Sequence, residues 1–209
     1  RIACLFCRRA HLKRTSDMSL VHSYFDTGDV VLHYVRAGAG DAVVLLHGWP
    51  QSWYAWHKII PALAQRFHVI APDLRGLGDS SRPATGYDKA TIAEDIRKLL
   101  HRHLGIDRCD LVGHDWGGPV AFCLAATYPD MVRKLVMLDT AVPGDGSGSF
   151  SQHGRRWHHA FHQTMDLPEA LVAGREDIYL GWFYRQFGYQ PGAIGPEAIA
   201  EYLRTYRQD

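Results

Sequence analysis

The 209-residue chain is long enough for one well-buried α/β domain and too short for two full domains. Its 23 Lys and Arg residues nearly balance 22 Asp and Glu residues, and no long charged block is present, which argues against nucleic acid and anionic membranes as partners. No stretch approaches the ~18 continuous apolar residues that cross a bilayer.

The first 17 residues, RIACLFCRRAHLKRTSD, are cationic but lack an apolar core of the length that a secretion signal needs. We expect residues 1–17 to be a disordered extension and the folded domain to begin at Met18. The cysteines at positions 4, 7, 109 and 123 fit neither a disulfide framework nor a zinc site. We therefore expect a reducing, cytoplasmic compartment.

Strand and helix patterns alternate from Val30 onward. The β-rich runs 30–38 and 42–48 are separated by a glycine turn, which predicts a hairpin that enters a sheet. Residues 52–64 carry apolar side chains at helical spacing, and the short apolar run 68–73 then predicts a buried strand.

The best-defined helix is expected after Thr91, which forms a capping-box pattern with Glu94 ahead of an apolar helical face. A strand at 109–113, a helix at 117–127 and a strand at 134–139 follow. This alternation predicts an α/β fold with a mostly parallel sheet covered by helices on both faces.

The pattern changes after Pro143. GDGSGS predicts a flexible joint, and the region beyond it is rich in Trp, His, Tyr and Phe at helical spacing without strand patterns. We therefore divide the chain into the extension, a core at 18–144 and a helical lid at 145–209.

The stretch GHDWGG, residues 113–118, lies between a predicted strand and a predicted helix. A strand that ends in small-x-nucleophile-x-small is typical of a nucleophile elbow, where small residues permit a strained turn that exposes one side chain. Gly113 and Gly117 are the small residues, so Asp115 is the exposed one. The alternative is that Asp115 caps the following helix, because aspartate is favoured at that position.

An aspartate at this turn favours attack at a saturated carbon. Serine would leave an ether there, whereas a carboxylate leaves an ester that an activated water can hydrolyse. HGWP, residues 47–50, ends a predicted strand, at the place of a loop that donates an oxyanion-hole N–H. The N–H groups of Trp49 and Trp116 are the predicted pair, and a cis Trp49–Pro50 bond would fix the turn.

Three motifs, HGWPQSWYAW, PDLRGLGDSSRP and LVGHDWGG, resemble in order and spacing the epoxide hydrolase and dehalogenase branch of the α/β-hydrolase superfamily. The match runs from about Val30 to Gly144 and continues more loosely into the lid. The resemblance implies an α/β-hydrolase fold with Asp115 as nucleophile, Trp49 and Trp116 as oxyanion hole, and a helical lid that polarises the leaving atom.

HGWP resembles the epoxide hydrolases more closely than the haloalkane dehalogenases. Epoxide hydrolases use two lid tyrosines as O–H donors to the epoxide oxygen, and RRWHHAFHQ resembles the first tyrosine segment, with His158 in the tyrosine's place. The resemblance makes Trp157, His158 and Phe161 the lid residues at the substrate. Fluoroacetate dehalogenases carry arginines where Trp116 and Pro119 stand here, so a small neutral substrate is expected.

The family's order is nucleophile, acid and then histidine. The usual acid, the histidine and the last strands would lie beyond Asp209, so we expect this chain to be an incomplete part of a longer enzyme. Asp139 is an alternative acid, although a loop anchor explains it equally well. The spacing of metal ligands is also present in His158, His159 and His162, but no acidic or cysteine partner stands with them. The stretches GAG at 38–40 and GLG at 76–78 lack the third glycine of a dinucleotide-binding loop. Neither a metal nor a cofactor is predicted.

The predicted function is hydrolysis of an epoxide to a diol through an alkyl-enzyme ester at Asp115. The alternatives are dehalogenation of a haloalkane or haloacid and, from another class, a non-catalytic ligand-binding homologue or an inactive fragment. The expected partners are a small neutral organic substrate and water, without nucleic acid or membrane, and a homodimer is left open.

Overall fold

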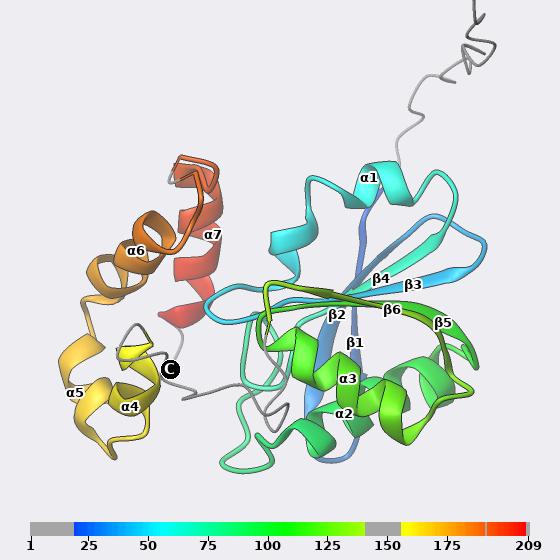
Figure 1. Ribbon diagram of the computed structural model, residues 1–209, viewed down its shortest axis with the longest axis horizontal. Coiled ribbons are helices and arrows are strands. Elements are labelled where there is room, and N and C mark those ends of the chain that lie inside the picture. The colour runs from blue at the N-terminus through cyan, green and yellow to red at the C-terminus, as the bar shows by residue number, and fades with distance from the viewer. Residues whose placement is uncertain (1–18, 141–155, 191, 208–209) are drawn as a thin grey trace, which may run out of the picture.

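The computed structural model describes residues 19–140, 156–190 and 192–207. Within these residues a single mixed sheet forms the core, and four helices lie together beside it (Figure 1). The strands are β1 (Val21–Asp26), β2 (Val31–Ala37), β3 (Ala42–Leu46), β4 (His68–Pro72), β5 (Cys109–His114) and β6 (Val132–Leu138). The predicted α/β class is confirmed, while the expected extension and flexible joint lie outside the described residues.

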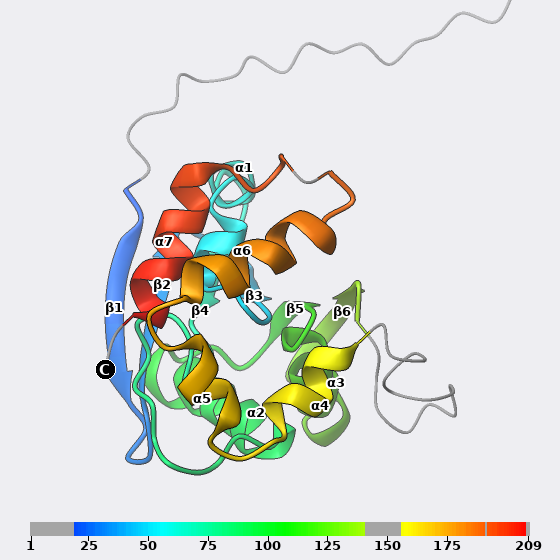
Figure 2. The ribbon, with the colours of Figure 1, turned by 90° about the vertical axis from the view of Figure 1, so that its left-hand side faces the viewer.

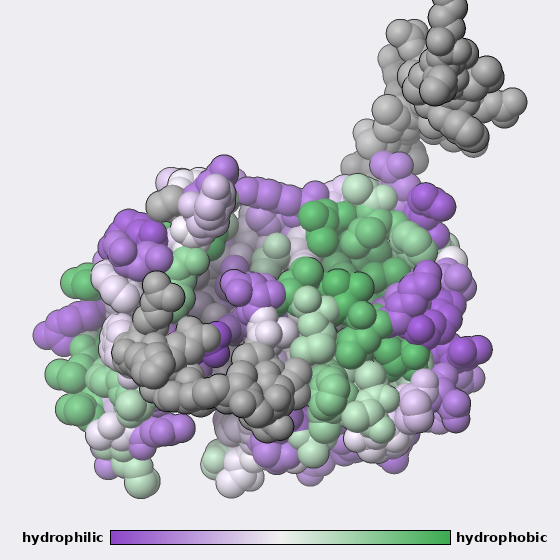
Figure 3. Space-filling model, viewed as in Figure 1, coloured by the Kyte–Doolittle hydropathy of each residue, from purple (hydrophilic) through white to green (hydrophobic). Residues whose placement is uncertain are grey.

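The strand order is β1-β2-β4-β3-β5-β6. β3 pairs in parallel with β4 and β5, and β5 pairs in parallel with β6, whereas β1 and β2 run antiparallel to their neighbours. All of β3 is buried, because a central parallel strand is covered on both faces. β6 lies at the edge of the described sheet. Figure 3 shows hydrophobic residues gathered over the sheet side of the molecule. In β6, Val136 and Leu138 are exposed.

The predicted hairpin between residues 30–38 and 42–48 is wrong, because β4 lies between β2 and β3 and takes up the hydrogen-bonding edges of both. Gly38 has a φ of 74°, and a Cβ there would lie 2.8 Å from the Cα of Ala64. The glycine turn therefore passes against the segment that precedes β4. β1 was not predicted, since its six residues VHSYFD lack a clear apolar alternation.

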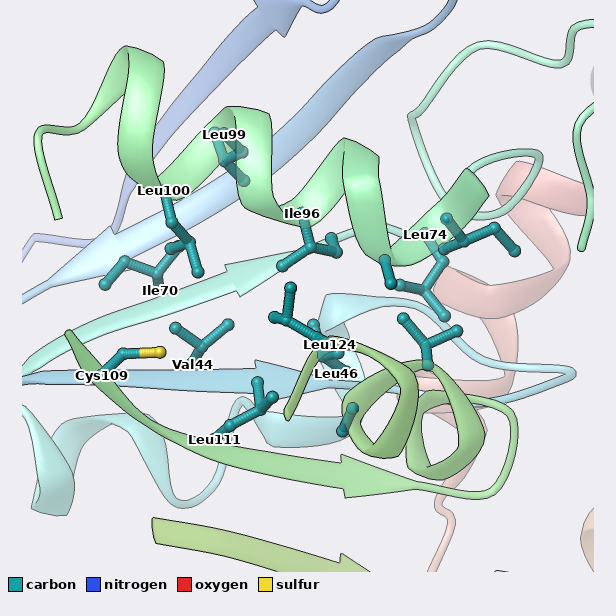
Figure 4. Close-up of a cluster of buried hydrophobic side chains, with 14 of the residues drawn as sticks. Val44, Leu46, Ile70, Leu74, Ile96, Leu99, Leu100, Cys109, Leu111 and Leu124 are labelled. Carbon is teal, nitrogen blue, oxygen red and sulfur yellow. The ribbon is translucent and has the colours of Figure 1, made fainter. Parts of the chain in front are cut away.

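Helices cover both faces of the sheet, as predicted (Figure 1). One face carries α2, η2 and α3, whose leucines and isoleucines pack on β3, β4 and β5 (Figure 4). η1 and α1 cover the other face. Their bounds are η1 (Trp53–Trp56), α1 (Ile60–Leu63), α2 (Lys89–Arg97), η2 (Lys98–His103) and α3 (Gly117–Thr127).

Two helix predictions need correction. The helix expected at 52–64 is split into η1 and α1, and Pro61, which has no N–H to donate, stands in the first turn of α1. The helix expected after Thr91 begins earlier. Its N-cap is Asp88, whose carboxylate accepts hydrogen bonds from the Thr91 N–H at 2.9 Å and the Thr91 hydroxyl at 2.6 Å. Thr91 is therefore a donor and does not form the predicted capping box with Glu94.

The described part of the predicted lid is helical and consists of α4 (Trp157–His162), α5 (Leu167–Val172), α6 (Glu176–Gln186) and α7 (Pro196–Tyr206). Figure 2 views the molecule from the side on which these helices lie. Arg204 on α7 forms two hydrogen bonds with Asp79 at 2.8 and 2.6 Å, and the Tyr184 hydroxyl donates to the Pro50 carbonyl at 2.6 Å. These contacts hold α6 and α7 on the core. No helix of the described residues is both long enough and apolar enough to cross a membrane.

Candidate active site

A cavity of about 600 Å³ lies between the ends of β5 and β6 and the lid helices. It brings together most of the residues that the sequence singled out, although they come from distant parts of the chain. The predicted site residues on its wall are Trp49, Asp115, Trp116, Asp139 and His158.

The turn after β5 has the geometry of a strained elbow. Asp115 has a φ of 49°, a left-handed conformation that costs a residue other than glycine about 1–3 kcal/mol. A Cβ on Gly117 would lie 2.7 Å from the carbonyl carbon of Leu46, and one on Gly113 would lie 2.8 Å from the Cα of Gly118. The glycines therefore allow β3, the turn and α3 to meet backbone to backbone.

The Asp115 carboxylate is held by the HGWP loop. The Trp49 N–H donates to Asp115 Oδ1 at 2.8 Å, and Asp115 Oδ2 has no hydrogen-bond donor among the described residues. The side chain does not cap α3, whose N-cap is Trp116, so the capping alternative is wrong. The Trp116 N–H has no acceptor in the described parts of the chain and lies at the positive end of α3.

Several contacts fix the HGWP loop. The Trp49–Pro50 bond is cis, as expected. His47 is fully buried, its Nδ1 donating to the Gly48 carbonyl at 3.0 Å and its Nε2 accepting from the Leu74 N–H at 3.1 Å. Burial lowers the His47 pKa, and because one ring nitrogen donates and the other accepts, the imidazole is neutral.

Thr140, which follows the end of β6, supports the elbow, and no sequence pattern predicted this role. Its hydroxyl donates to the Asp115 carbonyl at 2.8 Å, and its Cβ would be 2.7 Å from a Cβ on Gly118. Thr140 follows Asp139, which has a φ of 42°, at the carboxyl end of a parallel strand. The position of Thr140 after a predicted strand could have indicated this role, because the carboxyl ends of parallel strands meet at one edge of a sheet.

His158 lies in the cavity wall, and its ring stacks on Trp49 with 5.8 Å between the ring centroids. It is 8% exposed, and its Nδ1 is buried without a hydrogen-bond partner in the described residues. Burial, followed by the neighbouring His159, lowers the His158 pKa to about 4. The imidazole is therefore neutral at pH 7.

The other two predicted lid residues lie outside the cavity wall. Trp157 packs on Phe183 at 5.8 Å, and Phe161 packs on Tyr179 at 5.7 Å. The His158, His159 and His162 pattern does not form a metal-binding group. Within the described ranges, one group of side chains lies close enough to hold a metal ion: His33, Asp73 and Asp79. His33 and Asp73 already bond each other at 2.8 Å.

Two lid tyrosines serve mainly as packing residues. Tyr184 on α6 and Tyr202 on α7 are each 3% exposed and belong to one hydrophobic cluster. The Tyr179 hydroxyl is paired with His162 Nε2 at 2.8 Å.

Lys89 also lines the cavity, although no sequence pattern predicted it. Its ammonium lies 3.1 Å above the centroid of the Trp116 ring. Burial lowers the Lys89 pKa to about 8, although the nearby Asp115 and Asp88 charges act in the opposite direction. No local motif marks this lysine, because the fold alone brings the start of α2 to the elbow.

Comparison with known proteins gives consistent results. A family model described as the alpha/beta hydrolase fold matches residues 41–188. The chain is 48% identical over 181 residues to a soluble epoxide hydrolase of Corynebacterium sp. (strain C12), covering 83% of this chain and 63% of that protein. It is 36% identical over 196 residues to a fluoroacetate dehalogenase of Burkholderia sp., covering 87% of this chain and 62% of that protein. The chain thus spans less than two thirds of the length of either relative.

Solved structures agree with the sequence comparisons. The structure of the epoxide hydrolase CorEH without ligand superposes with a TM-score of 0.85 at 43% identity, covering 90% of this chain and 69% of that one. Cfl2 from Burkholderia cenocepacia superposes with a TM-score of 0.82 at 42% identity, covering 90% of this chain and 66% of that one.

Proposed function

The chain belongs to the α/β-hydrolase fold family, and from this membership and the geometry around Asp115 we propose that it hydrolyses an epoxide to a diol. One observation carries the proposal. The Trp49 N–H holds one carboxylate oxygen of Asp115 at 2.8 Å, and the other oxygen has no donor among the described residues. The similarity to a protein named soluble epoxide hydrolase supports an epoxide as the substrate.

In the first step, Asp115 Oδ2 attacks a ring carbon of the epoxide. A carbon–oxygen ester bond forms, the ring bond to oxygen breaks, and the ring oxygen keeps the electron pair. His158 is placed to donate a hydrogen bond to this developing alkoxide, because a neutral imidazole retains one N–H donor. The ester carbonyl oxygen is Oδ1, which stays at the Trp49 N–H.

In the second step, a water attacks the carbonyl carbon of the ester, which is Cγ of Asp115, and Oδ1 becomes the oxyanion. The Trp49 and Trp116 N–H groups would bind that charge at the end of α3. Collapse of the adduct breaks the bond between Cγ and Oδ2, so the diol leaves with Oδ2 and the Asp115 carboxylate keeps the oxygen of the water. The two protons of the water go to the ring oxygen and to the leaving oxygen. The attacking water needs a general base. The family's order of nucleophile, acid and histidine assigns this role to a histidine, and Asp139 is a candidate acid inside this chain.

A dehalogenase is the second candidate, because the fluoroacetate dehalogenase of Burkholderia sp. is also similar. In that reaction the same carboxylate would displace a halide from carbon, and the ester would be hydrolysed in the same way. The non-catalytic alternative would bind the same molecules without any ester.

The experiment compares styrene oxide with 1-bromobutane as substrates of the protein and of Asp115→Asn. Diol is followed by chromatography and bromide by ion-selective electrode. We expect diol from styrene oxide, little bromide, and neither product from Asp115→Asn. Bromide without diol would favour the dehalogenase, and diol formation by Asp115→Asn would exclude the ester mechanism.

A further inference from the structure

Lys89 lies where two cavities meet. The larger cavity, of about 600 Å³, contains Asp115, and a smaller one of about 230 Å³ lies beside it. Both are lined by Trp49, Lys89 and Trp116. The Lys89 ammonium lies over the face of the Trp116 ring, and Trp116 directly follows Asp115 in the chain. The Lys89 ammonium is therefore part of the wall that a substrate of Asp115 would contact.

The ammonium has hydrogen-bonding capacity that the described residues leave unused. An ammonium carries three N–H donors, and a ring face can engage only one side of it. Across residues 19–140, 156–190 and 192–207, no carboxylate forms an ion pair with Lys89 and no oxygen accepts a hydrogen bond from it. The preceding Asp88 is occupied by the backbone N–H and the hydroxyl of Thr91.

Four other cations differ in this respect, because each has a carboxylate partner at hydrogen-bonding distance: Arg75 with Asp95, Arg97 with Glu94, Lys98 with Asp29 and Arg204 with Asp79. Lys89 is half-buried, and burial lowers its pKa to about 8 although the nearby Asp115 and Asp88 charges act in the opposite direction. A further anion bound beside the ammonium would offset part of this desolvation.

We propose that Lys89 binds a carboxylate group of the substrate, so that the site prefers epoxides that carry a carboxylate over neutral epoxides of the same size. This inference rests on the proposed function and names its substrate class. A neutral substrate was expected because positions 116 and 119, just after the nucleophile, carry Trp116 and Pro119 in place of arginines. Lys89 supplies from α2 the positive charge that those two positions lack. The alternative is that Lys89 only packs on the Trp116 ring and contacts no ligand.

Binding of unreactive probes tests the proposal without any chemistry. Benzoate and benzamide have nearly the same shape and differ in charge, and their affinities are measured by calorimetry at pH 7. We expect the protein to bind benzoate at least about tenfold more tightly, because a hydrogen bond to a charged group contributes more than a neutral one. Lys89→Met should abolish this preference, and Lys89→Arg should retain most of it.

Lys98→Met is the matched control, because it removes a lysine of η2 that lines neither cavity and whose ammonium pairs with Asp29. It should keep the benzoate preference. Thermal unfolding of each variant shows whether the fold is intact. Equal affinity for the two probes in the unsubstituted protein would overturn the proposal, as would a preference that survives in folded Lys89→Met.

A second readout separates this inference from the proposed function. The rates at which 3-phenylglycidate and styrene oxide alkylate Asp115 are compared in the protein and in Lys89→Met by acid quench and mass spectrometry. The ratio of the two rates should fall about tenfold or more in the variant. Alkylation by both epoxides with an unchanged ratio would refute the role of Lys89 and leave the ester mechanism standing. Benzoate preference without any alkylation would support the Lys89 site and refute the ester mechanism.

Discussion

Gly48 touches the proposed nucleophile so closely that any side chain should disturb it. A Cβ at position 48 would lie 2.7 Å from Asp115 Cγ and closer still to Asp115 Cβ and Oδ1, whereas ordinary contacts begin at 3.4 Å. In Gly48→Ala the Asp115 side chain or the HGWP loop must therefore move by about 1 Å, and a displacement of this size costs about 10²-fold in rate.

The assay is the rate at which styrene oxide alkylates Asp115, followed by acid quench and intact mass. Gly192→Ala is the control, because a Cβ there meets nothing within 4 Å and should leave the rate unchanged. Thermal unfolding checks that both variants are folded. A folded Gly48→Ala protein that is alkylated at the unsubstituted rate would refute the close approach of the two residues.

Three further predictions concern the core and the lid. In Arg75→Met, the buried Asp95 carboxylate loses two hydrogen bonds of 2.8 and 2.9 Å. The free energy of unfolding, measured in urea, should therefore fall by about 3–5 kcal/mol. A much smaller loss would mean that Asp95 is well solvated. The His158 pKa is lowered to about 4 in the folded protein, so the unfolded chain takes up a proton on this histidine at a higher pH than the folded protein does. The free energy of unfolding should therefore fall as the pH drops from about 6.5 towards 4. In chemical denaturation, His158→Phe should make this pH dependence weaker. Arg204→Ala removes the partly exposed pair with Asp79, so hydrogen exchange in α7 should become faster while global stability changes by less than about 1 kcal/mol; unchanged exchange would contradict a role in holding α7.

Local patterns predicted the elbow well, because its chemistry lies within six residues. Gly113 and Gly117 flank Asp115 in the sequence, and the turn that they imply is the turn observed. The cis Trp49–Pro50 bond was likewise foreseeable from adjacent residues.

Features that depend on distant contacts were missed. The hairpin prediction failed because strand pairing is decided across the sheet, where β4 takes the place between β2 and β3. Lys89 is an ordinary helix-start residue until the fold brings it to Trp116. The capping prediction at Thr91 failed for a smaller reason, since Asp88 competes for the same N–H and is better placed to accept it.

The central claim is that Asp115 is the nucleophile, and trapping its ester tests this most directly. The protein is mixed with styrene oxide, quenched in acid and mapped by peptide mass spectrometry, with Asp115→Asn in parallel. We predict a single adduct with the mass of one styrene oxide molecule, located on Asp115, labile to hydroxylamine as an ester should be, and missing from Asp115→Asn. An adduct found only on histidine or cysteine side chains, or one that persists in Asp115→Asn, would contradict the claim.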